Sequence, residues 1–134
     1  RSKDCLGRTG SKTTGRCLFG DIHFETGAVP KGASVCHCSQ CRRQSGHLWA
    51  SAYVSRAALK IFGPVTWFHA TPGARRGFCP RCGSFLFWTA EDEDTISFSL
   101  GALDRPTGIK LEKHIFVADK GDYYDIADDL PRKP

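Results

Sequence analysis

The sequence lacks methionine, long apolar runs and any stretch with the spacing of a long amphipathic helix. No apolar run approaches the roughly 20 residues that cross a bilayer. The first sixteen residues are basic and contain no apolar core of a secretory signal. We therefore expect a cytoplasmic protein without a membrane partner. Because methionine is absent, we also expect residues 1–14 to be a disordered or added tail and residues 15–134 to form a single domain.

Positive charge is concentrated at one end of the chain. The net charge is +5, of which residues 1–16 carry +4 and the remaining chain only +1. A solvated tail accounts for such an excess. The rest of the chain has no basic stripe of the kind that follows phosphates. We therefore expect no nucleic-acid partner.

The periodicity of the sequence predicts strands and very little helix. Short segments with alternating apolar residues are separated by Gly and Pro, as in all-β domains of small packed antiparallel sheets. One helical turn is expected before Gly46, and an acidic turn at 91–94 joins two strands. Residues on either side of Gly63 and Pro64 are expected to pair as a hairpin. The expected strands are 16–25, 47–55, 59–63, 65–70, 84–90, 95–100 and 113–118.

Three cysteines, Cys36, Cys38 and Cys41, lie within six residues. Side chains alternate along an extended segment, so Cys36 and Cys38 project to one face, and a turn can return Cys41 to them. His37 then points away and is expected to position a ligand or lie in the core rather than to bind metal. Thiolates in this arrangement suit a tetrahedral Zn²⁺ ion whose fourth position stays open.

A second cysteine unit, Cys79-Pro80-Arg81-Cys82-Gly83, has the form of a zinc knuckle. Seven cysteines without an export signal favour metal binding over a disulfide framework. Two arrangements are open. One is a single structural zinc ribbon that uses Cys38, Cys41, Cys79 and Cys82. The other, which we favour, is an open site at Cys36, Cys38 and Cys41, together with a structural clip of Cys79, Cys82 and Cys17.

Four segments, "GRCLFGDIHFE", "CHCSQCRRQSG", "FCPRCGS" and "KHIFVADKGDYYDIADDLP", follow one another between Gly15 and Pro131. In order and spacing they resemble the glutathione-dependent formaldehyde-activating enzyme family, which includes centromere protein V. The resemblance implies an Mss4-like, β-tent fold with two zinc ions. It places a catalytic zinc on Cys36, Cys38 and Cys41, and a structural zinc on Cys17, Cys79, Cys82 and one further cysteine.

The sequence departs from the family at that further cysteine. The family pattern in the first strand resembles C-x-C-G, whereas this chain has Cys17-Leu18-Phe19-Gly20. Phe19 cannot bind a metal. The fourth ligand of the second site would then come from water, a nearby histidine or Cys5, and occupancy of that site is in question.

The open site suits thiol chemistry better than hydroxide formation. Three thiolates leave a zinc centre with a formal charge of −1, which makes it a weak Lewis acid, yet zinc still deprotonates a coordinating thiol, and thiolate is the nucleophilic form of sulfur. The resemblance names glutathione as the thiol and formaldehyde as the electrophile, so the expected activity is that of a carbon–sulfur lyase similar to S-(hydroxymethyl)glutathione synthase. The alternative is a non-catalytic, zinc-scaffolded interaction module.

Candidate substrate contacts are the arginines, because guanidinium groups recognise the carboxylates that glutathione carries. Arg42 and Arg43, beside the third sulfur, are the first candidates, and Arg75 and Arg76 are the second. His47 and His69 are weaker candidates for proton transfer. The aromatic residues are expected to belong to the core: Trp49, Tyr53, Trp67, Phe85, Phe87 and Trp88.

Overall fold

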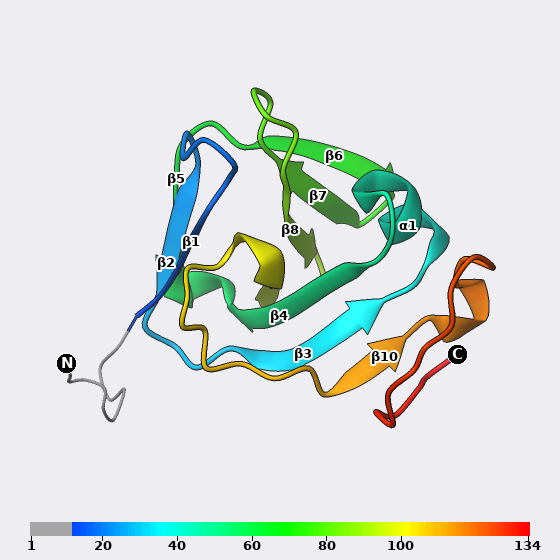
Figure 1. Cartoon of the computed structure of the whole chain (residues 1–134). Coiled ribbons are helices and arrows are strands. Elements are labelled where there is room, and N and C mark those ends of the chain that lie inside the picture. The colour runs from blue at the N-terminus through cyan, green and yellow to red at the C-terminus, as the bar shows by residue number, and fades with distance from the viewer. Residues whose placement is uncertain (1–11) are drawn as a thin grey trace.

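The structure is a computed structural model that describes residues 12–134. It contains ten strands, one α-helix and three short 3-10 helices (Figure 1). The prediction of a mostly β, Mss4-like fold with little helix is confirmed. Among the described residues, no helix combines the length and apolar character needed to cross a membrane. The α-helix is α1 (Ser39–Ser45), and the strands are β1 (Thr13–Arg16), β2 (His23–Thr26), β3 (Lys31–Cys36), β4 (Trp49–Ser55), β5 (Leu59–Phe62), β6 (Thr66–Thr71), β7 (Ala74–Phe78), β8 (Phe85–Ala90), β9 (Thr95–Ser99) and β10 (Lys113–Ile115).

The strands form two sheets of different size. A three-stranded antiparallel sheet has the order β1-β2-β5, and a seven-stranded sheet has the order β10-β3-β4-β9-β8-β7-β6. Within the larger sheet, β10 runs parallel to β3, and the other neighbours are antiparallel. The all-antiparallel expectation is therefore wrong at one edge. The long stretch between β9 and β10 allows that parallel return.

Aromatic side chains join the two sheets. Phe24 of β2 is buried and meets Phe87 of β8 edge-on, with ring centroids 5.1 Å apart, and it also contacts Phe98 of β9. Leu86 and Ile22 are likewise fully buried in this core. Burial of large apolar side chains is the main source of stability here, at roughly 1.5–3 kcal/mol for each one.

Three local predictions differ from the structure. The expected strand 16–25 is broken by a turn, in which the Gly20 N–H donates to the Cys17 carbonyl at 3.2 Å and Gly20 adopts φ +86°. Residues 59–63 and 65–70 do not pair, because β5 joins β2 while β6 joins β7. The expected strand 113–118 ends at Ile115, where a 3-10 helix, η3 (Val117–Asp119), follows.

The hairpin around the acidic turn is confirmed, since β8 pairs with β9, and so is a strand after Gly46. The first strand begins at Thr13, two residues before the expected domain boundary. Thr13 and Thr14 therefore belong to the folded part, where they pair with β2. The rest of the expected tail, residues 1–11, lies outside the described residues.

Candidate metal centres and the adjoining cavity

The first cysteine group is built where β3 passes into α1. Cys36 is the last residue of β3, Cys38 is the N-cap of the helix, and Cys41 lies in its first turn. The Cys41 N–H donates to the Cys38 sulfur at 3.3 Å, so the sulfur takes the role that a Ser or Asp oxygen takes in an ordinary cap. All three sulfurs lie within 4.8 Å of one another. This group could hold a metal ion.

A buried arginine faces this group from β7. Arg76 is only 6% exposed, and its guanidinium donates to the Cys41 sulfur at 3.6 Å. The same guanidinium donates to the side-chain oxygens of Gln40 and Gln44, at 2.9 and 3.2 Å. Between residues 12 and 134, no carboxylate forms an ion pair with Arg76. Its charge is therefore directed at the sulfurs.

Even without a metal, the surroundings of the group favour ionisation of one of its three thiols. A hydrogen bond from Cys36, together with the charge of Arg76, lowers the pKa of Cys41 to about 6. The same bond and burial raise the pKa of Cys36. A group that already stabilises negative sulfur is suited to a cation, because metal ligands must be deprotonated.

A cavity of about 550 Å³ opens beside the first group. All three cysteines line it, and it extends along one face of β3 and β4, past Trp88 of β8, to β10 and the segment after it. Its volume falls in the usual range for small-molecule sites. The charged residues of its wall are Arg76, Lys113 and Asp119, and the aromatic ones are Trp49, Tyr53, Trp88 and Phe116.

The cavity wall does not include Arg42 or Arg43, the arginines we first predicted to contact substrate. Arg43 is exposed, and Arg42 has a buried Nε that forms no hydrogen bond within the described residues. Arg76 occupies the position expected of them. Arg75 and Arg76 are the second candidates of the sequence. They are adjacent in β7, so alternation turns one to solvent and the other inward, but it does not say which. The Arg75 guanidinium lies over the Trp67 ring, 4.2 Å from its centroid.

His37 is not a member of the cysteine group and is 1% exposed. Its Nε2 lies 2.9 Å from Nδ1 of His114 in β10, and its Nδ1 bonds the Tyr124 hydroxyl. His114 Nε2 in turn lies 3.0 Å from an Asp128 oxygen. With both rings neutral, the bonds run in one direction: Tyr124 O–H donates to His37, His37 to His114, and His114 to Asp128. Burial lowers the pKa of His37 and so favours this neutral form.

The two other candidate histidines lie away from the cavity, whereas some of the aromatic residues line it. His47 is exposed and bonds the Tyr123 hydroxyl at 2.8 Å, and His69 is exposed on β6. Neither lines the cavity. Trp49, Tyr53 and Trp88, which were expected in the core, line the cavity wall. Trp49 and Trp88 also belong to a small core cluster with the three cysteines. Their alternation along the strands resembles that of a core residue, so the sequence carries no signal for this difference.

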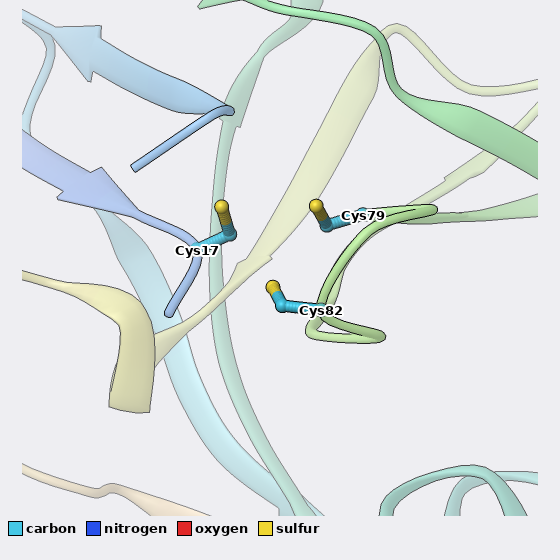
Figure 2. A group of neighbouring side chains, drawn as sticks. All are labelled: Cys17, Cys79 and Cys82. Carbon is cyan, nitrogen blue, oxygen red and sulfur yellow. The ribbon is translucent and has the colours of Figure 1, made fainter. Parts of the chain in front are cut away.

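The second cysteine group connects distant parts of the chain. Cys17 lies in the turn after β1, while Cys79 and Cys82 lie in the knuckle between β7 and β8. Figure 2 shows the three side chains directed toward one another, and their sulfurs lie within 4.8 Å. The Ile22 N–H donates to the Cys17 sulfur at 3.3 Å. The Ser84 hydroxyl lies 3.2 Å from the Cys82 sulfur, and this bond lowers the pKa of Cys82 to about 6.

Two separate groups of three sulfurs are thus present, as the two-site arrangement predicts. The single-ribbon alternative is wrong in its geometry, because Cys38 and Cys41 group with Cys36 and not with the knuckle. The donors of both groups fit a thiophilic ion such as Zn²⁺. Phe19 supplies no ligand to the second group and is 72% exposed. Cys5, the alternative fourth ligand, lies outside the described residues.

Comparison with known proteins agrees with this architecture. The sequence profile of a family described as "Glutathione-dependent formaldehyde-activating enzyme" matches residues 12–119. The fold is similar to the crystal structure of a Rhodobacter sphaeroides protein, with a TM-score of 0.56 and 22% identity, over 72% of this chain and 90% of that one. That similarity supports the fold alone. A search of curated proteins gives no match.

Proposed function

The chain belongs to the glutathione-dependent formaldehyde-activating enzyme family, and from this premise we propose that it is a zinc-dependent carbon–sulfur lyase. The reaction joins a thiol, glutathione, to formaldehyde or a related aldehyde. The S–H proton moves to the carbonyl oxygen, the carbonyl π bond breaks and a sulfur–carbon bond forms, which gives a hydroxymethyl thioether. The lyase name refers to the reverse cleavage.

The observation that supports this proposal is the position of the first cysteine group in a cavity wall. Cys36, Cys38 and Cys41 supply three sulfurs, and the cavity of about 550 Å³ gives a small molecule access to them. Zinc bound there would lower the pKa of an incoming thiol so that it is held as the thiolate.

The residues of the wall suit a zwitterionic thiol. Arg76 presents a buried positive charge beside the sulfurs, and Lys113 presents a second one. These two cations are the proposed partners of the substrate carboxylates. Asp119 is the proposed partner of the substrate ammonium group. Trp49, Tyr53 and Trp88 line the cavity, and we propose that they shield the reacting sulfur from water when substrate is bound.

The test is glutathione binding measured by calorimetry on the zinc-loaded full chain. We expect saturable binding at the first cysteine group, loss of that component in Cys38→Ser, and much weaker binding of S-methylglutathione at this group, because it has no free thiol. The matched control is Cys82→Ser, which removes a sulfur of the second group and should retain the glutathione binding that Cys38→Ser loses. If Cys38→Ser binds glutathione normally, the ligand assignment is wrong. Zinc binding without any thiol binding would instead indicate the non-catalytic interaction module.

A further inference from the structure

The second cysteine group has three sulfurs and no fourth protein ligand among the described residues. No other Cys, His, Asp or Glu of residues 12–134 joins Cys17, Cys79 and Cys82 in this group. Structural zinc sites are almost always four-coordinate. This group is therefore one donor short of a closed site in that part of the chain.

The residues around the group show where a fourth ligand could approach. Phe19, two positions after Cys17, is 72% exposed, so its own side chain is turned to solvent and is not packed over the sulfurs. Leu18 is also exposed, and its N–H donates to the Ser84 hydroxyl at 3.2 Å. Cys82 is only half-buried, unlike Cys17 and Cys79. The group is thus partly open on the side of Cys82.

A second, independent observation is a cavity of about 400 Å³ at this position. Of the three cysteines it borders Cys17 alone, together with Leu18 and Ser84, and it continues to Leu103 and Asp104. This cavity is distinct from the one beside Cys36, because the two share no lining residue. A molecule of a few heavy atoms can therefore lie beside Cys17 without entering the first cavity.

We propose that Cys17, Cys79 and Cys82 form a second open metal site, which takes a low-molecular-weight thiol as its fourth ligand. Three thiolates select soft, thiophilic ions such as Zn²⁺, and a thiol that coordinates such an ion is deprotonated. Leu86 and Leu103 in the cavity wall are apolar, so they favour a thiol, whose carbon atoms can contact them, over a water molecule as the fourth ligand. This proposal concerns other residues than the proposed lyase site and does not depend on it.

Cobalt substitution can test the proposal directly. In the Cys36→Ser/Cys38→Ser double variant of the full chain, Co²⁺ reports only the second group, and the sulfur-to-cobalt charge-transfer band scales with the number of thiolates. Titration with 2-mercaptoethanol should raise this band by about one third, because a fourth thiolate joins three. Adding Phe19→Cys to the same background should give the four-thiolate band at the outset and abolish the response. A band that does not respond to the thiol in the Phe19-containing protein would overturn the proposal.

Cys5 provides the second control. Adding Cys5→Ser should leave the band and its thiol response unchanged. If the double variant already shows the four-thiolate band and Cys5→Ser reduces it, Cys5 is the fourth ligand and the proposal is wrong.

A second measurement guards against misfolding of the double variant. In the otherwise unchanged, metal-loaded chain, Phe19→Cys should slow the release of one of two metal ions to a chelator at least tenfold, while the other ion leaves at the parental rate. Equal release rates in the parent and in Phe19→Cys would contradict an open fourth position.

Discussion

Arg76 gives the proposed lyase site its particular charge. A buried guanidinium without a carboxylate partner among residues 12–134 is costly unless another anion lies nearby. The sulfur of Cys41 is the negative group that it contacts, and Gln40 and Gln44 hold its orientation. An incoming carboxylate would meet a guanidinium that is already fixed in direction.

The neighbouring arginines allow a matched test of this role. Arg76→Gln keeps hydrogen-bonding capacity but removes the charge, and we expect glutathione to bind about 10- to 100-fold more weakly, since a hydrogen bond to a charged group contributes about 1.5–3 kcal/mol. Arg75→Gln changes the adjacent arginine, which lies over Trp67 outside the cavity. It should bind like the parent in the same calorimetric titration. An equal loss of glutathione affinity in the two variants would show that only the overall charge of the protein matters, and not the position of Arg76.

At the scale of elements, the C-terminal segment (121–134) is attached to the edge of the larger sheet. The backbone N–H of His114 in β10 donates to the Pro131 carbonyl, and the Lys133 N–H donates back to His114, both at 2.9 Å. Figure 1 shows this segment, in red, running beside β10. Through Tyr124 and Asp128, the segment also reaches the buried pair His37 and His114. The loop that carries Cys36 and Cys38 is thus supported from the other end of the chain.

This attachment should depend on pH. The hydrogen bond from His114 holds the pKa of Asp128 below its usual value of 3.8. A carboxyl group with a lowered pKa in the folded state contributes stability that is present above 3.8 and is lost as the pH falls through the folded pKa. Asp128→Asn should therefore unfold at lower urea concentration than the parent at pH 7, and the difference should shrink below pH 3.8.

The matched control is Asp129→Asn, since Asp129 forms no side-chain hydrogen bond or ion pair within residues 12–134. It should unfold like the parent at both pH values, as followed by circular dichroism. A difference between Asp128→Asn and the parent that stays constant on acidification would show that the carboxylate charge is not involved.

The same elements show what the sequence could predict. Local patterns were sufficient for the first cysteine group, for the hairpin of β8 and β9 and for the knuckle, because each is closed by residues near in sequence. Partners far apart were harder to predict. The pairing of β5 with β2, the parallel return of β10 and the inward direction of Arg76 depend on tertiary packing. The periodicity of a single strand does not record which strand lies beside it.

For the whole molecule, the two cysteine groups differ in how far along the chain they reach. The first joins residues within a six-residue segment, whereas the second joins Cys17 to Cys79 and Cys82. Closing a long loop removes more conformational entropy from the unfolded chain. Metal at the second group should therefore stabilise the fold more than metal at the first.

This difference gives a prediction for the metal-loaded protein. Cys82→Ser should be less stable than Cys38→Ser by about 2 kcal/mol, from the ratio of the loop lengths. Thermal unfolding of both variants after zinc loading measures the difference. After complete chelation both should melt at similar temperatures, because neither group then closes a loop. If Cys82→Ser and Cys38→Ser melt at the same temperature after zinc loading, the second group holds no metal.

The span of the second group also bears on how the protein is made. On the ribosome, Cys36, Cys38 and Cys41 emerge almost together, so a nascent chain can capture its first ion before most of the larger sheet exists. Cys17 must wait until the knuckle has been synthesised. Biogenesis would then have a fixed order, with the proposed reactive centre loaded first and the clamp between distant segments last.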